Sequence, residues 1–172
     1  MTMRERYQIA KDEGVIYRTY LDSLNYPTGG IGHLLSDTEA KTYPLGTAIP
    51  ASVVEQWFDF DMLEAVEIAD KFLKKADKPS DELHDIITNM AFNLGATGLS
   101  RFRRMWGAIY KGDFIGAARE MKDSLWYFQV GDRSKRLHAR MLALGGNENV
   151  GITDTSNRDS SGESPTRPES GC

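Results

Sequence analysis

Cysteine is almost absent from the sequence: the 172 residues include only Cys172. This excludes an intrachain disulfide framework and a zinc site built from cysteines. There is also no run of about 18 apolar residues, and no apolar segment follows the charged start MTMRERYQIAKDEG. We therefore expect neither a membrane-spanning segment nor a secretory signal peptide. The three histidines are scattered, so we predict no metal site and no cofactor.

A strong excess of one charge is missing as well, since 21 basic and 25 acidic residues give a formal net charge of −4. This balance argues against an ordinary nucleic-acid-binding protein. The charges are nevertheless unevenly placed along the chain. Residues 148–172 hold five acids and two bases, segment 53–85 holds ten acids and four bases, and segment 101–140 holds ten bases and four acids. An acidic segment followed by a basic one predicts a polarised surface.

The order of the predicted elements indicates an α+β protein that is mostly α. A short helix is expected first, ended by Gly14, and is followed by a β-hairpin or small meander with a glycine-rich return. A long helix with an apolar stripe comes next, and then a series of helices. Asp81 is the candidate cap of the first of these, and Asp113 and Asp132 are candidate N-cap or first-turn acids of later ones. The predicted ranges are 3–12, 52–75, 81–94, 98–110, 113–122 and 132–143 for the helices and 15–34 for the strands.

These elements predict a bilobed domain over residues 1–146 and a tail over 147–172. The tail is rich in Ser, Gly, Thr and Pro and has no aromatic residue, so it cannot bury enough apolar surface to offset the entropy of ordering. We expect it to be a disordered tail or linker, in which Cys172 would be an exposed and incidental thiol. The domain itself divides into a small β lobe (14–51), a connecting helix (52–76) and a helical lobe (77–146).

Glu13, Asp22 and Thr28 are the candidates for catalysis. Glu13 ends the first helix, where the negative end of the helix dipole favours a protonated carboxyl group. Asp22 lies at the far end of the first strand and Thr28 near the start of the return strand, so a hairpin can bring both close to Glu13. Two carboxyl groups flanking a cleft, one protonated and one ionised, are the arrangement used by glycosidases. Taken singly, these residues also fit an ordinary helix end and an ordinary turn.

Asp61 falls on the apolar stripe of the long helix, where a carboxylate needs a partner. His33, at the end of the glycine-rich segment, is the natural candidate, and we interpret this pair as structural. Arg133, Arg136 and Arg140 recur at helical spacing. They fit either a solvated basic face or a face from which one arginine reaches a cleft carboxylate.

Three ordered blocks of sequence carry a more specific pattern. In the first, EGVIYRTYLDSLNYPTGGIGHLL, eight residues separate Glu13 from Asp22 and five separate Asp22 from Thr28. The second is ITNMAFNLGATGLSRF, and the third is SLWYFQVGDRSKR. Together these blocks resemble the phage-type lysozymes, the T-even phage lysozyme-like muramidases of glycoside hydrolase family 24. The resemblance extends over roughly residues 4–143.

This resemblance implies a lysozyme-like bilobed fold and hydrolysis of the β-1,4 bond between N-acetylmuramic acid and N-acetylglucosamine in bacterial peptidoglycan. Glu13 would be the general acid, and Asp22 with Thr28 would hold the attacking water in an inverting mechanism. Arg133 would pair with Glu13, and His33 with Asp61 would match the family's buried histidine–aspartate pair. The positions that align with the substrate cleft are Leu34, Phe92, Met105 and Glu120, of which the last two replace small or amide side chains.

The resemblance also has consequences for the small lobe and for partners. The stretch after His33 is shorter than in T-even phage lysozyme, so the small-lobe helix is expected to shrink to a turn around YPLGTAIP. We expect a monomer that acts on peptidoglycan, with no nucleic-acid partner and no membrane insertion. It would be made in the host cytoplasm and act in the periplasm with the help of a holin, or it would be attached to the virion through a baseplate.

Two other functions remain open at this point. A lytic transglycosylase cleaves the same bond with one glutamate and forms an anhydro product, but the presence of both Asp22 and Thr28 argues against it. A non-catalytic wall-binding module of a phage tail is the other alternative, and there Glu13 or Asp22 would be expected to be replaced.

Overall fold

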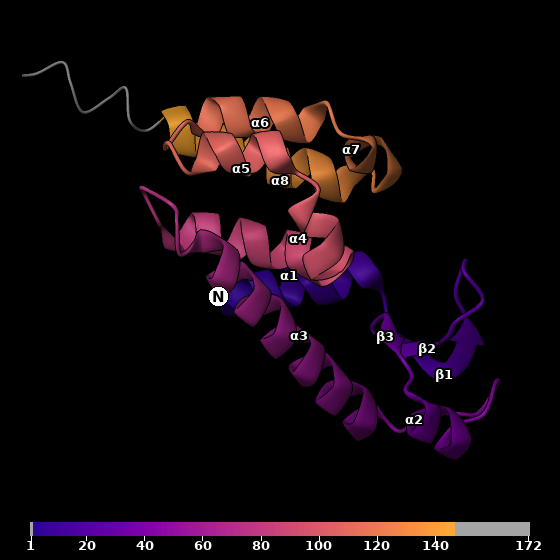
Figure 1. Ribbon diagram of the computed structural model, residues 1–172. Helices are drawn as coiled ribbons and strands as arrows, with labels where there is room; N and C mark the ends of the chain where they lie inside the picture. The colour runs from indigo at the N-terminus through magenta and orange to yellow at the C-terminus, as the bar shows by residue number, and fades with distance from the viewer. Residues whose placement is uncertain (1, 147–172) are drawn as a thin grey trace, which may run out of the picture.

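The described residues form two lobes joined by a long helix (Figure 1), and each lobe has its own hydrophobic core. The computed structural model describes residues 2–146, and the predicted tail and Cys172 lie outside the described residues. The predicted class is confirmed, because helices dominate and the only sheet in the described part has three short strands. No helix among residues 2–146 has the length and apolar character needed to cross a membrane.

The first helix, α1 (Met3–Glu13), begins and ends as its sequence predicts. The Thr2 hydroxyl accepts a hydrogen bond from the backbone N–H of Glu5, which caps the helix. Gly14 ends it with φ +72°, and its N–H donates to the carbonyl of Ala10 at 3.1 Å. A left-handed residue at this position suits glycine, which has no Cβ atom to clash. Glu13 is therefore held at the last position of a regular helix.

The strands form an antiparallel meander in the order β1-β2-β3. In this sheet Tyr20 lies opposite Thr28 and Leu21 lies opposite Pro27, which places Asp22 in the turn just beyond. The hairpin or small meander predicted for residues 15–34 is confirmed. The strands are β1 (Ile16–Leu21), β2 (Pro27–Gly30) and β3 (His33–Leu34).

The small lobe keeps a helix of its own, so the predicted reduction to a turn is wrong. Helix α2 (Asp37–Thr42) precedes the YPLGTAIP segment. It is stabilised by a capping box in which Glu39 N–H donates to the Ser36 hydroxyl while the Glu39 carboxylate accepts from the Ser36 N–H. The S-x-x-E pattern that builds this cap is present in the sequence and was overlooked there.

Helix α3 (Ala51–Leu73) connects the two lobes, as predicted. Val54 and Phe58 near its start are buried in the small-lobe core, whereas Ala65 and Ala69 are buried in the helical-lobe core. One apolar stripe thus enters both cores in turn. In Figure 1 the helix runs obliquely from the sheet end of the molecule to the helical lobe.

The helical lobe differs from the predicted series in three details. Ser80, not Asp81, caps α4, because the Ser80 hydroxyl accepts from the N–H of Leu83 at 3.1 Å. Gly95, with φ +62°, interrupts α4 and ends its first section where predicted, so residues 98–110 are not one helix. A short helix, α7, was not predicted. The helices are α4 (Asp81–Ser100), α5 (Arg103–Ile109), α6 (Phe114–Lys122), α7 (Leu125–Gln129) and α8 (Asp132–Gly146).

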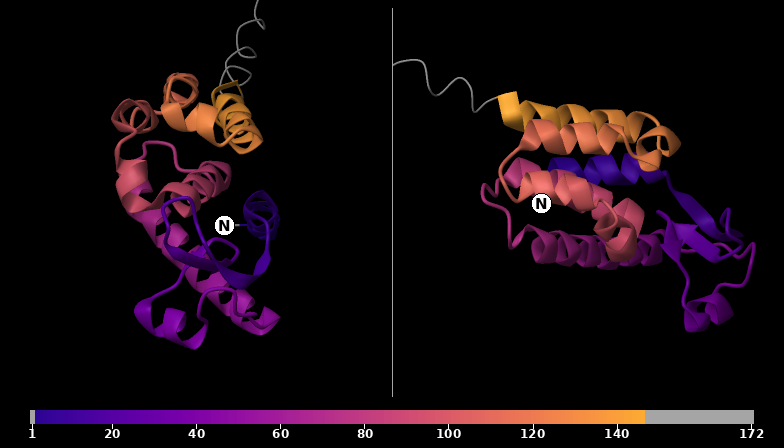
Figure 2. Two further views of the ribbon diagram at one scale, coloured as in Figure 1. Left: turned by 90° about the vertical axis from the view of Figure 1, so that its right-hand side faces the viewer. Right: turned by 45° about the horizontal axis from the view of Figure 1, so that its top comes forward.

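Helix α1 belongs to both lobes by contact. Its Ile9 is fully buried in the small-lobe core. The helix runs alongside α4 (Figure 2), and its acidic side chains accept hydrogen bonds from α8. The helix that ends in Glu13 is therefore packed by apolar contacts on one side and by polar contacts on the other.

Candidate active site

Glu13 has two carboxylate oxygens with different surroundings. Oε1 accepts a hydrogen bond from Arg133 Nη1 on α8. Oε2 faces the tight turn between β2 and β3, where a Cβ atom at Gly32 would lie 3.6 Å from it. Gly32 has φ +75°, so this turn both requires a glycine and leaves room beside the carboxyl group. One oxygen is thus fixed by an arginine, and the other lies beside the Gly32 turn.

Asp22 is fixed by the turn that follows β1. Its Oδ1 atom accepts two backbone N–H groups, from Leu24 at 2.8 Å and from Tyr26 at 2.9 Å. The turn is closed by Asp22 N–H donating to the Tyr26 carbonyl at 3.0 Å, and Asn25 takes a left-handed φ of +65°. Within residues 2–146, Oδ2 has no hydrogen-bond partner. The turn therefore orients the carboxylate and leaves one oxygen available.

Thr28 lies in β2 and is buried. Its hydroxyl donates to the Tyr26 carbonyl at 3.1 Å, so Thr28 is tied to the same turn as Asp22. The structure thus brings two of the predicted catalytic residues together through one backbone segment. The remaining lone pair of the hydroxyl can accept a hydrogen bond.

Tyr20 lies within electrostatic range of both Glu13 and Asp22. Its phenol is partly buried, and burial raises the pKa of Tyr20 above its usual value. The negative charges of Glu13 and Asp22 both raise this pKa further. Tyr20 therefore lies near enough to both carboxyl groups for their charges to act on it. Tyr20 was not among the predicted site residues.

A cleft of about 750 Å³ opens beside Glu13. It is lined from one side by the end of α1 and from the other by the start of α8. Asn93, at the end of the first section of α4, forms part of its wall and accepts a hydrogen bond from Trp126 Nε1 at 2.8 Å. The cleft is large enough for a ligand of several ring units rather than for a single ion.

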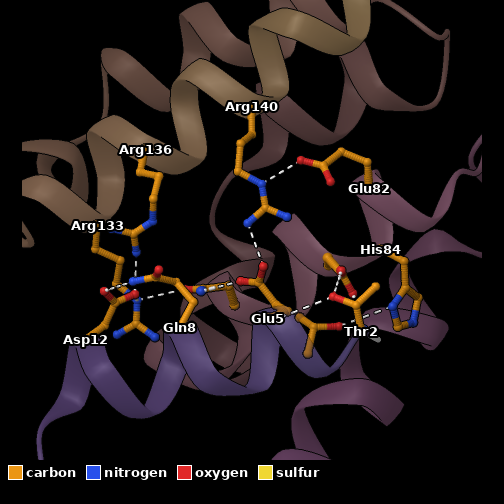
Figure 3. A network of polar contacts seen from close by, with 12 residues as sticks. Thr2, Glu5, Gln8, Asp12, Glu82, His84, Arg133, Arg136 and Arg140 are labelled. Atoms are coloured by element: carbon orange, nitrogen blue, oxygen red, sulfur yellow. Dashed lines mark hydrogen bonds and ion pairs between the residues drawn. The ribbon is translucent and has the colours of Figure 1, made fainter.

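Three arginines of α8 reach across to α1, as Figure 3 shows. Arg133 donates to Glu13, Arg136 Nη2 donates to Asp12 Oδ2 at 2.5 Å, and Arg140 Nη1 donates to a third acid of α1 at 2.6 Å. The interpretation of this row as a solvated basic face is therefore wrong, and all three arginines, not one, contact carboxylates. Acidic side chains of α1 therefore neutralise much of the excess positive charge of segment 101–140.

The carboxylate that meets Arg140 is Glu5, which is only 2% exposed. Arg140 also donates through Nε to Glu82 Oε1 at 2.5 Å. Burial lowers the pKa of Arg140, but the hydrogen bonds and charges of Glu82 and Glu5 outweigh it and raise that pKa. Arg140 therefore stays charged and compensates the buried Glu5.

Asn89 of α4 links Glu5, the partner of Arg140, to Arg133, the partner of Glu13. Its Oδ1 accepts from Arg133 Nε at 2.7 Å, and its Nδ2 donates to Glu5 Oε1 at 2.6 Å. Neither Asn89 nor Glu5 was predicted from the sequence. A signal was present, because Glu5 lies one turn from Ile9 on the first helix and Asn89 directly precedes Met90 on the buried stripe of the second.

His33 and Asp61 make the contact that was proposed for them. His33 Nδ1 lies 3.0 Å from each Asp61 oxygen, and the ring stacks on Trp57 with centroids 4.6 Å apart. The other ring nitrogen lies 3.4 Å from Glu39 Oε2. Burial lowers the pKa of His33, but the hydrogen bonds and charges of Asp61 and Glu39 raise it above its usual value.

The predicted substrate-binding residues do not form one group. Leu34 is 59% exposed on β3, and Phe92 packs edge-on against Phe58 between the two cores. Met105 is fully buried in the helical-lobe core, so its side chain offers no exposed atom to a sugar; this corrects its expected role. Glu120 lines a second cavity of about 600 Å³ and lies 3.8 Å from Arg104.

Nothing in residues 2–146 groups three or more His, Cys, Asp or Glu side chains in a way that could hold a metal ion. The chemistry available at this site is that of two carboxyl groups, a hydroxyl and a guanidinium group. One carboxyl group is tied to an arginine and the other to a turn. Groups of these kinds can donate a proton and orient a water molecule.

Comparisons with known proteins agree with this chemistry. A family model described as phage lysozyme matches residues 10–143. "Probable T4-type lysozyme 1" of Dictyostelium discoideum is 28% identical over 149 residues, which cover 73% of this chain and 86% of that protein. The pre-baseplate central spike protein Gp5 of Enterobacteria phage T4 is 27% identical over 172 residues, or 88% of this chain. The peptidoglycan hydrolase gp36 of Pseudomonas phage phiKMV is 28% identical over 79% of this chain. The match spans only 29% of the spike protein and 15% of gp36.

Proposed function

The chain belongs to the phage lysozyme family, and from this premise we propose that it is a muramidase. It would hydrolyse the β-1,4 bond between N-acetylmuramic acid and N-acetylglucosamine in bacterial peptidoglycan, with inversion at the anomeric carbon. The observation that carries this proposal is the way in which the two carboxyl groups are held, Glu13 by an arginine and Asp22 by a turn that Thr28 also contacts, with both charges acting on Tyr20.

Glu13 is proposed as the general acid. Arg133 occupies Oε1, so the proton for the leaving oxygen is carried on Oε2, which lies beside Gly32. Arg133 is 7% exposed, so water does not compete for the hydrogen bond by which it positions the Glu13 carboxyl group. Proton donation to the glycosidic oxygen leaves an oxocarbenium-like centre on the sugar and an ionised Glu13 that Arg133 can compensate.

Asp22 and Thr28 are proposed to hold and activate the attacking water. The two backbone N–H groups on Oδ1 keep the Asp22 carboxyl group oriented, so Oδ2 can accept one proton of the water. The Thr28 hydroxyl can accept the other. Water held on the face of the sugar ring opposite Glu13 would attack the anomeric carbon and invert its configuration.

The biological setting that we propose is entry through the host wall. The similarity to a baseplate spike protein favours attachment to the virion, with a baseplate as partner. The same activity released with a holin would serve host lysis. Mass spectrometry of purified virions separates the two settings, because a virion enzyme is recovered with the particles and a lysis enzyme is not.

Product analysis tests the activity. Purified peptidoglycan digested with the protein should yield reducing N-acetylmuramic acid ends, and NMR should show the α-anomer first if the reaction inverts. Glu13→Gln should abolish this release. Anhydro ends would instead indicate a lytic transglycosylase, and binding without cleavage would indicate a non-catalytic wall-binding module. Either result would overturn the muramidase assignment.

A further inference from the structure

The catalytic side of Glu13 is connected to a buried carboxylate at the other end of the same helix. The connection leaves α1 at Glu13, passes through Arg133 on α8 and Asn89 on α4, and returns to α1 at Glu5. The two intermediate hydrogen bonds measure 2.7 Å and 2.6 Å. Figure 3 shows Glu5 and Arg133 within this network.

All the linking groups are removed from solvent. Asn89 is 0% exposed, Glu5 is 2% exposed and Arg133 is 7% exposed. Water therefore cannot replace a lost partner at low cost, and each group depends on its neighbour in the network.

The chemistry of the two ends fixes the orientation of the amide between them. Glu5 accepts hydrogen bonds when ionised, whereas the Arg133 guanidinium can only donate. The Asn89 side chain has one end of each kind, so its NH₂ group must face Glu5 and its oxygen must face Arg133. Glu5 is thus the acceptor that the Asn89 NH₂ group meets, and it favours this orientation of the amide.

Glu5 is itself held in place by Arg140, which binds its second oxygen. This ion pair compensates the buried charge, while Glu82 on the outer side of Arg140 is far more exposed. The function of the Glu5 oxygen that faces Asn89 can therefore be separated from the function of the ion pair.

We propose that Glu5 is a positioning residue for Glu13 and that it acts through Asn89 and Arg133. This inference rests on the proposed function. The Glu5 carboxylate orients the Asn89 amide, and the amide oxygen holds the Nε–H of Arg133. The guanidinium is then fixed with Nη1 on Oε1 of Glu13, which leaves Oε2 for the proton. No residue of this linkage other than Glu13 would touch the substrate's reacting atoms.

The test compares two double variants of the full chain, Glu5→Gln/Arg140→Met and Glu5→Met/Arg140→Met. Both remove the buried ion pair as a whole, which proteins often tolerate better than the loss of one partner. The side chains introduced at residue 5 are both long and unbranched, but only the glutamine keeps an oxygen that can accept from Asn89. The readouts are kcat and KM on soluble, uncrosslinked glycan strands, together with the melting temperature.

The variant Glu5→Gln/Arg140→Met should keep kcat within about two-fold of the native chain. The variant Glu5→Met/Arg140→Met should lose about ten-fold in kcat at an unchanged KM, as expected for a misplaced catalytic group. Glu82→Gln is the control and should change neither kcat nor KM. Equal kcat values for the two double variants, or an effect on KM alone, would overturn the positioning role.

Two further results keep the outcome decisive. If a double variant fails to fold, Glu5→Gln alone should lower kcat about ten-fold, because Arg140 and Asn89 then compete for one oxygen; a native kcat would refute the role. If the native chain does not cleave the glycan, the proposed function fails. If the native chain cleaves and Glu13→Gln does not, but the two double variants are equal, only the role of Glu5 fails.

Discussion

The charges of Glu13 and Asp22 both act on Tyr20, but the two carboxyl groups are held by contacts of very different range. The hydrogen-bond partner of Glu13 is Arg133, 120 residues away in the chain. The partners of Asp22 are the backbone N–H groups of Leu24 and Tyr26, two and four residues away. The Glu13 side of the site therefore depends on the assembled tertiary structure, whereas the Asp22 side depends on a turn that closes locally.

The largest effects are expected from Glu13→Gln and Asp22→Asn, each of which should lower turnover by about 10²–10⁴-fold. Their effects on stability should differ. An asparagine at residue 22 keeps an oxygen for the two backbone N–H groups, so the free energy of unfolding should change by less than about 1 kcal/mol. Glu13→Gln weakens the partner of a buried guanidinium and should cost about 1–3 kcal/mol. Urea unfolding with activity assays measures both, and equal stability losses would contradict the comparison.

Arg140→Met should destabilise the Glu13 side without altering the Asp22 turn. Glu5 would remain buried with Asn89 as its main partner, and the loss of one member of a buried pair costs about 3 kcal/mol. Glu82→Gln, which touches only the exposed side of Arg140, should cost less than about 1 kcal/mol. Chemical denaturation of the two variants gives both values, and similar values would show that the buried contact is not the important one.

Gly32→Ala tests the turn that faces Glu13 Oε2. A residue with a Cβ atom at φ +75° costs about 1–2 kcal/mol, and the new methyl group would approach the carboxyl group. Gly107→Ala on α5 is the matched control, since a Cβ atom there meets nothing within 4 Å and alanine favours a helix. Thermal unfolding should show a lower melting temperature for the first variant only.

The smallest effect is a pH dependence confined to the small lobe. Because the pKa of His33 is raised in the folded protein, protonated His33 contributes stability that is fully present below about pH 6.5, its unfolded value. This contribution is lost as the pH rises through the raised folded value. Urea unfolding between pH 5 and about pH 9 should show this decrease, and His33→Gln should remove it. A decrease of the same size in the variant would assign it to another group.

The range of the contacts also explains what could be predicted from the sequence. The helix end at Glu13 and the turn at Asp22 follow from local signals, a glycine after a helix and a cluster of turn residues between strands. The contact of Asp61 with His33 was foreseeable, because a carboxylate on an apolar stripe requires a partner. Helix α2 was predictable from its capping box. The shorter stretch after His33 suggested a turn instead, but a short segment can still hold a helix of a few residues.

The connection through Asn89 could not be derived in the same way. Helical spacing shows that Arg133, Arg136 and Arg140 share a face, but it does not show which helix lies against that face. Glu5 and Asn89 are separated by 84 residues, and their pairing depends on how α1 packs against α4. The prediction that Met105 binds substrate was wrong for a different reason. Alignment with a cleft position does not reveal that a larger apolar side chain turns into the core.

The distance between Glu13 and Arg133 along the chain also sets an order of events during synthesis. A ribosome releases α1 and the β1–β2 turn early, so the Asp22 side can form while the rest of the chain is still being made. Arg133 and Arg140 emerge more than a hundred residues after their partners on α1. Until α8 has left the ribosome, Glu13 has no guanidinium to hold it. The Glu13 side of the site is therefore completed only after α8 has been translated, long after the Asp22 turn.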